Sequence, residues 1–346
     1  MTGSKSGLIM KNLVVYGPGD IRIEEKSVPQ IEEDKVLIKV DTCGICGTDL
    51  LIYQGKFPVT FPYHNLGHEY CGEVVEVGSR VKNVSPKDRV IVNPNYWCGY
   101  CYFCSMGEEH LCRNKKIFKA KSNGGFSEYV LVSEKLVHKI PKDLSSEHAT
   151  FVEPLSCCLH GVDMIGIRMG ASVAILGGGT IGLLMLQLMK LNGCAKVILS
   201  EPLEIKRDVA KDIGADIVVN PLSEDLVKIV EANTPHGVDI VIECAGVSDT
   251  IKESFNIIRD KGTILFLALS DQKLQVPFSH FQVVQKELNI RGAVFGHRTH
   301  ERAIELLSDG KIHVEPIITH RYRLNDIKTA IEVCLQGKAI KTLVTT

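Results

Sequence analysis

Residues 172–182 read Ser-Val-Ala-Ile-Leu-Gly-Gly-Gly-Thr-Ile-Gly, and this stretch decides the fold. A short apolar run ends in glycines with the spacing Gly-x-Gly-x-x-Gly, and an apolar helical segment follows over residues 183–189. A strand, a glycine turn and a helix in this order bind the pyrophosphate of a dinucleotide at the positive end of the helix. We therefore expect the cofactor to contact Gly177, Gly179, Thr180, Ile181 and Gly182.

Apolar runs alternate with helical segments beyond the glycines, which is typical of βαβ units on a doubly wound parallel sheet. The runs occupy residues 196–199, 217–219, 239–242 and 263–267. Up to about residue 150 the pattern is different, because Gly, Pro and Asp separate short strands at residues 35–40, 73–77 and 89–92. A helical stretch at 301–307 and a strand-like stretch at 341–344 follow. The sequence thus predicts an α/β chain with a β-rich part and a parallel-sheet part.

Composition excludes several classes of protein. The chain has 346 residues, of which 45% are hydrophobic, with 40 Lys+Arg against 41 Asp+Glu. It offers no excess of positive charge for nucleic acid and no apolar run of membrane-spanning length, so we expect a cytoplasmic protein without nucleic-acid or membrane partners. Thiols stay reduced in that compartment, so the spacing of the 12 cysteines indicates metal sites before disulfides.

A cysteine-rich loop spans residues 98–112 with the spacing C-x2-C-x2-C-x7-C. Four thiolates complete the shell of a structural Zn²⁺ and leave no position for substrate. Free or disulfide-linked cysteines and an iron–sulfur cluster are the less favoured alternatives. The predicted ligands of this structural zinc are Cys98, Cys101, Cys104 and Cys112.

A second, scattered set of residues suits a catalytic metal. Cys, His and carboxylate ligands can hold Zn²⁺ and leave one position open for water or substrate. The candidates are Cys46, His68, Glu69 and Glu153, with the hydroxyl of Thr48 nearby. Cys43 precedes Cys46 by three residues, and the residues alone leave open a zinc pair made by these two thiols.

Glu201 bears on the choice of cofactor. It lies nineteen residues beyond Gly182, at the end of the next predicted strand. A carboxylate there bonds the ribose hydroxyls of NAD and repels the 2′-phosphate of NADP, so we expect NAD. Lys206 and Arg207 are close enough in sequence to keep NADP as the minority alternative, and we expect Lys206 near the cofactor.

Together, the cysteine loop, the second metal set and the glycine loop resemble the zinc-dependent medium-chain dehydrogenases over essentially the whole chain. The stretch 151–156, Phe-Val-Glu-Pro-Leu-Ser, resembles their sorbitol (iditol) and polyol dehydrogenase branch. The resemblance implies a GroES-like catalytic domain at 1–153 and 291–346 around a Rossmann NAD-binding domain at 154–290. It implies two zinc ions per chain and a homo-oligomer, either a tetramer or a dimer.

The resemblance also assigns roles within the second metal set. It implies that Cys46, not Cys43, is the ligand, and that His68 is a ligand oriented by Asp49. Glu69 is a ligand in some relatives and a neighbouring carboxylate in others, and Glu153 would take the remaining position directly or through water. Thr48 would accept the proton of the alcohol.

Two positions depart from the family pattern. Leu51 stands where many relatives carry a proton-relaying His, and Phe295 stands where sorbitol dehydrogenases have an Arg that binds the polyol. We expect oxidation of a secondary alcohol, first of a polyol, to a ketone by hydride transfer to NAD. A sugar phosphate, threonine or a vicinal diol is the alternative substrate. A zinc-knuckle binding module with a nucleotide sensor, or a relative without catalysis, is a more remote alternative.

Overall fold

The computed structural model describes residues 8–114 and 123–346 and divides the chain into two compact units. The first unit combines residues up to Glu153 with His300–Asp309 and Ile318–Thr346. The second unit combines Pro154–Thr299 with Gly310–Ile317. Each unit therefore takes residues from distant parts of the chain.

The second unit has a six-stranded parallel sheet in the order β10-β9-β8-β11-β12-β13. The order reverses between β8 and β11, as in a doubly wound Rossmann sheet, so the expected fold is confirmed. The strands are β8 (Ser172–Leu176), β9 (Lys196–Ser200), β10 (Ile217–Val219), β11 (Val238–Glu243), β12 (Ile258–Phe266) and β13 (Asn289–Gly292).

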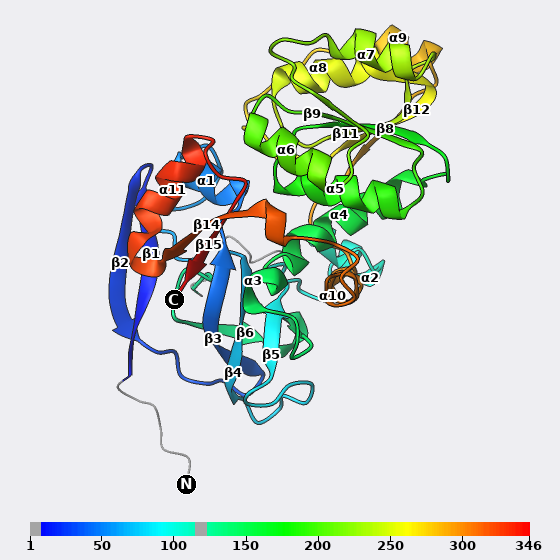
Figure 1. Ribbon diagram of the computed structural model, residues 1–346. Coiled ribbons are helices and arrows are strands. Elements are labelled where there is room, and N and C mark those ends of the chain that lie inside the picture. The colour runs from blue at the N-terminus through cyan, green and yellow to red at the C-terminus, as the bar shows by residue number, and fades with distance from the viewer. Residues whose placement is uncertain (1–7, 115–122) are drawn as a thin grey trace. The chain divides into compact units, whose positions relative to one another are not determined.

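Helices cover both faces of this sheet (Figure 1). One face carries α4 (Val152–Ile165), α5 (Thr180–Leu191) and α6 (Glu204–Asp212), and the other carries α7 (Leu226–Asn233), α8 (Ser248–Ile257) and α9 (His280–Gln285). Residues from Val173 to Leu176 are fully buried because a parallel strand covered on both faces has no solvent side. The continuous apolar runs of the sequence follow from this burial.

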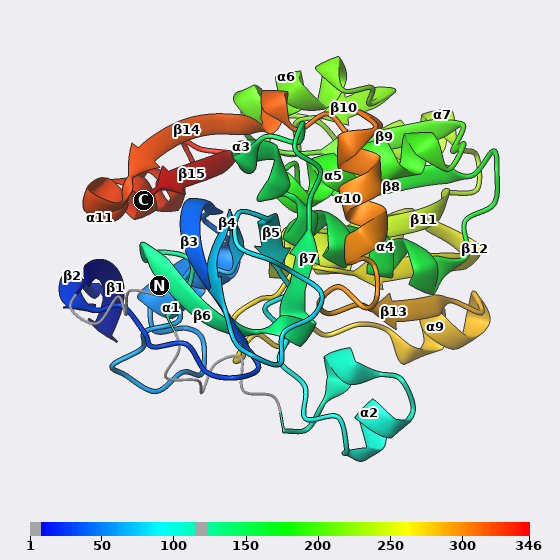
Figure 2. The same ribbon diagram turned by 90° about the horizontal axis from the view of Figure 1, so that it is seen from below.

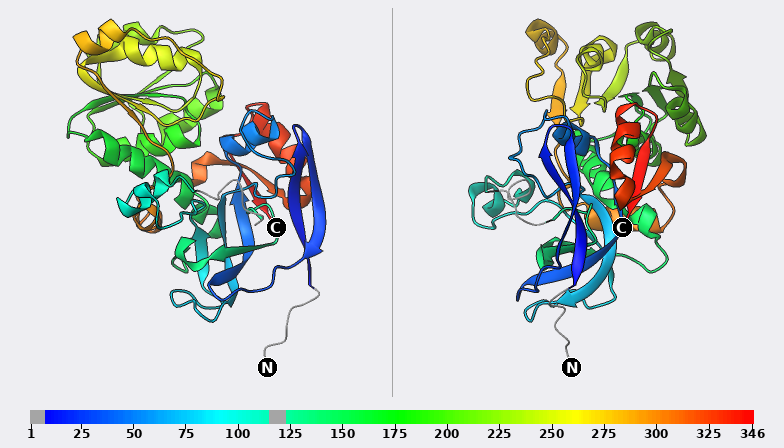
Figure 3. Two further views of the ribbon diagram at one scale, coloured as in Figure 1. Left: turned by 180° about the vertical axis from the view of Figure 1, so that it is seen from behind. Right: turned by 90° about the vertical axis from the view of Figure 1, so that its left-hand side faces the viewer.

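The first unit is built on a seven-stranded, mostly antiparallel sheet in the order β14-β15-β3-β4-β5-β7, with β6 also paired to β3. The strands are β3 (Lys35–Gly44), β4 (Glu69–Val77), β5 (Arg89–Val92), β6 (Tyr129–Ser133), β7 (Val137–Lys139), β14 (Ile318–Arg323) and β15 (Lys341–Thr345). A long hairpin of β1 (Ile9–Gly17) and β2 (Asp20–Ser27) forms a separate two-stranded sheet (Figure 3).

Helices of the first unit are short except near the C-terminus. They are α1 (Gly47–Tyr53), α2 (Tyr102–Ser105), α3 (Ser146–Ala149), α10 (His300–Ser308) and α11 (Ile327–Leu335). Strand β15 pairs antiparallel with β3, with Leu343 opposite Gly44 (Figure 2 shows β14 and β15 beside α11). The C-terminus of the chain thereby becomes part of the sheet that carries the N-terminal metal-binding candidates. No helix in the described parts of the chain is long and apolar enough to cross a membrane.

The chain returns to the first unit later than the sequence predicts. Residue 291, the expected boundary, lies inside β13, which pairs with β12 and so extends the Rossmann sheet. The return comes at His300, and Gly310–Ile317 belongs again to the second unit. There the Gln187 side chain donates to the carbonyl of His313 at 3.1 Å and accepts from its amide at 2.7 Å. The Gln187 side chain thus provides hydrogen-bond partners for the amide and carbonyl of His313, which is not part of a strand.

Candidate active site and metal centres

Cys46 and His68 come from two loops at one end of the sheet. Cys46 directly precedes α1, and His68 directly precedes β4. One ligand atom from each of Cys46, His68 and Glu69 forms a group in which all the atoms lie within 4.8 Å of one another. Both Cys46 and His68 are partly exposed, so the group is accessible from solvent.

Asp49 ties these two loops together. Its side chain is 1% exposed, and its carboxylate accepts from the amide of Cys46 at 2.9 Å and from the amide of Gly67 at 3.1 Å. The same carboxylate lies 3.7 Å from Nδ1 of His68. A buried carboxylate that holds both backbones fixes the separation of the thiol and the imidazole.

Burial opposes protonation of His68, but the charges of Cys46 and Asp49 outweigh it and raise the pKa of the imidazole well above its ordinary value. Surroundings that favour an imidazolium favour any cation. A thiol, an imidazole and a carboxylate at this separation also match the ligands that zinc takes in catalytic sites. The residues therefore fit a zinc ion.

Sequence reasoning missed Lys341, which pairs with Glu69. The Lys341 ammonium forms an ion pair with Oε2 of Glu69, and both side chains are almost completely buried. They are 272 residues apart in sequence. The only signal was a lysine in the strand-like stretch at the C-terminus, which gave no indication of its partner.

Three other candidates lie outside the group of ligand atoms. Cys43 is fully buried in the hydrophobic core, where burial raises the pKa of its thiol well above the ordinary value and so disfavours the thiolate that a metal needs. Glu153 is buried in the first turn of α4. Thr48 is half-buried in α1, two residues beyond Cys46.

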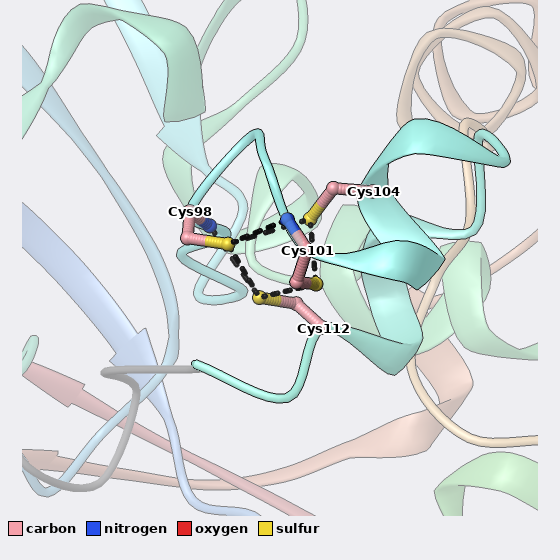
Figure 4. A group of neighbouring side chains, drawn as sticks. All are labelled: Cys98, Cys101, Cys104 and Cys112. Carbon is pink, nitrogen blue, oxygen red and sulfur yellow. Dashed lines mark hydrogen bonds between the residues drawn. The ribbon is translucent and has the colours of Figure 1, made fainter.

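The other metal candidate is the cysteine loop (Figure 4). Its Sγ atoms point toward one centre, with separations of 3.5 Å for Cys101–Cys104, 3.6 Å for Cys98–Cys112 and 3.8 Å for Cys101–Cys112. Four thiolates about 2.3 Å from a shared zinc have separations of this size. The amide of Cys101 also donates to Sγ of Cys98 at 3.4 Å. The four cysteines fit a structural zinc, and all 12 cysteines of the chain are free of disulfides.

The predicted glycine loop lies between β8 and α5, at the point where the strand order of the sheet reverses. Gly177 has φ of 105°, which favours glycine, and a Cβ on Gly182 would overlap the carbonyl oxygen of Gly177. Gly179 caps the N-terminus of α5, and Thr180 and Ile181 form its first turn. In such a sheet the crevice at this point is where a dinucleotide binds.

Glu201 is at the end of β9, beside the glycine loop. Its Oε2 accepts from the amide of Gly178 at 2.8 Å and its Oε1 accepts from the amide of Leu203 at 3.0 Å. Arg207 donates to the carbonyls of Glu201 at 2.9 Å and Pro202 at 2.6 Å. Lys206 is half-buried in α6. The carboxylate of Glu201 is thus held by the glycine loop, next to the place where the cofactor is expected to bind.

Comparison with known proteins agrees with these two kinds of site. The alcohol dehydrogenase GroES-like domain matches residues 32–142, and the zinc-binding dehydrogenase domain matches residues 180–309. D-arabinitol dehydrogenase 1 of Uromyces fabae is 35% identical over 340 residues, which cover 97% of each chain. The chain belongs to the zinc-binding alcohol dehydrogenase family.

Two further members of this family show how broad the likeness is. L-threonine 3-dehydrogenase of Pyrococcus furiosus is 36% identical over 342 residues, covering 97% of each chain. The crystal structure of a zinc-binding dehydrogenase from Sinorhizobium meliloti 1021 bound to NADP is 40% identical, with a TM-score of 0.93, and the match covers 98% of this chain and 100% of that one. The protein is therefore an NAD(P)-linked, zinc-dependent dehydrogenase, as expected from its motifs.

Proposed function

We propose that the protein oxidises a secondary alcohol of a polyol to a ketone by hydride transfer to NAD. The proposal is carried by the group of ligand atoms from Cys46, His68 and Glu69. Helix α1, which begins directly after Cys46, contains Thr48 and its hydroxyl. The glycine loop and Glu201 supply the means to hold the cofactor in the other unit.

In this mechanism, zinc held by Cys46, His68 and Glu69 would supply a Lewis acid that makes the substrate hydroxyl more acidic. Glu153, which lies outside this group, would take the remaining position directly or through a water molecule. Thr48 accepts the hydroxyl proton, and NAD held by the glycine loop would act as the hydride acceptor. Asp49 acts indirectly, because it fixes the backbones of Cys46 and Gly67 and so the geometry in which the proton moves.

NAD is the cofactor that Glu201 favours. A buried carboxylate beside the glycine loop accepts hydrogen bonds from the ribose hydroxyls and repels a 2′-phosphate. Arg207 donates hydrogen bonds to two backbone carbonyls, so fewer of its N–H groups are left to bind a phosphate. The related structure bound to NADP supports the alternative cofactor.

The substrate class follows from the relatives and is our preferred assignment among several. The D-arabinitol dehydrogenase favours a polyol, and the threonine dehydrogenase favours an amino alcohol at comparable identity. A sugar phosphate and a vicinal diol remain further alternatives. We also propose a cytoplasmic homo-oligomer with two zinc ions per chain.

A substrate screen tests the proposal. Purified protein is offered polyols, sugar phosphates, threonine and vicinal diols with NAD or NADP, and NADH or NADPH absorbance is followed. Cys46→Ala, which removes the thiolate but keeps the fold, should lose turnover on every substrate. Turnover by Cys46→Ala, or no reduction of either cofactor by zinc-loaded wild type on any of these alcohols, would contradict the proposed function.

A further inference from the structure

Strand β11 ends in a buried carboxylate at the edge of the Rossmann sheet where the glycine loop begins. Glu243, the last residue of β11, is 1% exposed and lies opposite Leu176 of β8 and Phe266 of β12. Leu176 leads directly into Gly177, the first residue of the glycine loop. The strand order reverses between β8 and β11, so Glu243 lies beside the crevice in which a dinucleotide binds.

Three donors converge on one oxygen of this carboxylate. The amides of Ala245 and Gly246 donate to Oε1 of Glu243 at 2.9 Å and 2.8 Å, and the hydroxyl of Thr250 donates to the same atom at 2.7 Å. Glu243 forms no ion pair with any residue that the structure describes. A buried carboxylate without a cation is costly unless hydrogen bonds compensate it, so these three bonds belong together.

The amide donors come from the residues that connect β11 to α8, which we call the β11 turn (244–247). This turn is packed against the glycine loop. The amide of Cys244 donates to the carbonyl of Leu176 at 2.8 Å, and a Cβ on Gly177 would lie 3.1 Å from the amide nitrogen of Ala245. By binding the β11 turn, Glu243 therefore determines what lies against the first glycine of the loop.

On its other side, the β11 turn is packed against the segment that follows β12. The amide of Leu267 donates to the carbonyl of Glu243 at 3.0 Å. Gly246 has φ of 69°, and a Cβ there would lie 3.2 Å from the carbonyl oxygen of Leu269. Val247 of the turn is 50% exposed. The turn thus lies between two segments at the carboxyl ends of parallel strands, with an apolar side chain exposed to solvent.

We propose that Glu243 is a positioning residue that holds the β11 turn against Gly177 and so fixes one wall of the cofactor crevice. The inference rests on the proposed function, because it takes a dinucleotide at the glycine loop as the cofactor. Without the carboxylate, three donors lose their shared acceptor and the turn is no longer held against the loop. A displacement of about 1 Å in this wall is enough to misplace the cofactor for hydride transfer.

Cofactor binding tests this without substrate. The reduced cofactor that wild type binds more tightly, NADH by our proposal, is titrated and its fluorescence is followed. We expect Glu243→Ala to raise the Kd about tenfold and to lower kcat at saturating cofactor, because the wall is displaced. Glu243→Gln keeps an oxygen acceptor on a side chain of the same size, so its Kd should stay within about threefold of wild type.

Asp239→Asn is the matched control on the same strand. Asp239 lies near the amino end of β11, away from the crevice, and pairs there with Arg259 at 2.7 Å. Its loss should lower Tm but leave the Kd for the cofactor unchanged. Thr250 gives a second test if Glu243→Ala does not fold. Thr250→Val removes one donor and should raise the Kd about threefold, whereas Thr250→Ser keeps the hydroxyl and should match wild type.

The outcomes separate this inference from the proposed function. A wild-type Kd in Glu243→Ala, or equal Kd values in Thr250→Val and Thr250→Ser, would overturn the role of Glu243. So would a Glu243→Gln variant that binds as weakly as Glu243→Ala, or an equal loss of binding in Asp239→Asn. A wild-type protein that binds neither NADH nor NADPH would instead overturn the glycine loop as the cofactor site, and the positioning role with it.

Discussion

Glu201 is a single side chain whose removal should change cofactor choice. Its carboxylate is fixed by the amides of Gly178 and Leu203, where a 2′-phosphate would meet a buried negative charge. We expect Glu201→Ala to weaken NAD binding about tenfold, the loss of one charge-assisted hydrogen bond, and to lower the KM for NADP. Steady-state kinetics with both cofactors measure this.

The control for Glu201→Ala is Glu204→Ala, an exposed carboxylate in the first turn of α6. It should leave the ratio of kcat/KM for the two cofactors unchanged. A wild-type enzyme that prefers NADP would show that Glu201 does not exclude the phosphate.

Leu51 is a residue whose replacement should open a proton path. It is half-buried in α1, three residues beyond Thr48, so it lies one helical turn away on the same face. An imidazole there titrates near pH 6.5 when unperturbed. We expect Leu51→His to add an ionisation in this range to the pH profile of kcat, measured where hydride transfer limits the rate.

Gln54→His is the control for Leu51→His, because Gln54 is exposed at the end of the same helix. Its pH profile should match that of wild type. If Leu51→His also matches wild type, water already carries the proton and Leu51 only lines the pocket.

At the residue scale, the sequence could predict side chains that are near one another along the chain or set by a motif. Asp49 is three residues from Cys46, and its contact with the His68 loop was expected from the family pattern. Lys341 could not be predicted, because its partner is 272 residues away and the contact depends on how β15 is placed in the sheet.

The cysteine loop is an element that should depend on its metal. Helix α2 has no buried residue, and Tyr100, Tyr102 and Met106 of the loop are 78%, 71% and 63% exposed. With so little apolar burial, zinc binding must supply most of the energy that orders the loop. We expect Cys101→Ser to lower the zinc content from two ions to one per chain and Tm by about 5–10 °C.

Metal analysis and thermal denaturation of freshly purified protein measure both effects. Cys157→Ser, which changes a cysteine outside both metal groups, should keep two zinc ions. One zinc ion in the active wild type, or two in Cys101→Ser, would contradict a structural zinc in this loop.

A buried histidine at the start of α10, His300, should make the stability of the first unit depend on pH. His300 is 2% exposed and its ring stacks on that of His138, with centroids 5.0 Å apart. Burial, and to a lesser degree the charge of His138, lower the pKa of His300 to about 3. The unfolded chain therefore binds this proton below about pH 6.5 when the folded chain does not.

The native state should thus lose stability as the pH falls from about 6.5 toward 3, and by pH 5 His300 alone accounts for about 2 kcal/mol. We expect His300→Gln to show a smaller fall in Tm between pH 7 and pH 5 than wild type. His236→Gln, at an exposed histidine of the other unit, should keep the wild-type slope. Equal slopes for wild type and His300→Gln would contradict the buried neutral imidazole.

At the element scale, five of the six strands of the second unit could be predicted, because parallel strands buried on both faces are continuous apolar runs. The exposed strand β13 has no such run and was not predicted. The ends of β8 and β10 coincide with the predicted ones. The segment around His313 could not be predicted, since its backbone is satisfied by the Gln187 side chain of α5, more than a hundred residues away.

At the scale of the whole molecule, the sequence could indicate that both chain ends build the first unit, but not where the chain returns. That point depends on β13 pairing with β12, which is a long-range contact. The same strand is an edge. Among the described residues it pairs only with β12, and all four of its residues are exposed.

We call the outer side of β13 and the exposed apolar residues of β13, α9 and the segment just before α9 the β13 edge surface; Figure 2 shows β13 beside α9. Its exposed apolar members are Phe278, Phe281, Val284 and Ile290. A free strand edge beside exposed aromatic residues invites pairing, and a second copy of this chain can pair its own β13 antiparallel across a two-fold axis. We therefore expect the proposed homo-oligomer to assemble through this surface.

Phe281→Lys/Ile290→Lys should halve the mass of the wild-type oligomer in light scattering, because it brings like charges from both copies into the proposed interface. Met169→Lys, at a residue that is 88% exposed on the same unit but outside the β13 edge surface, should leave the mass unchanged. A wild-type mass of 38.2 kDa would mean that the edge stays free in solution. An oligomer that survives the double substitution would mean that it assembles through another surface.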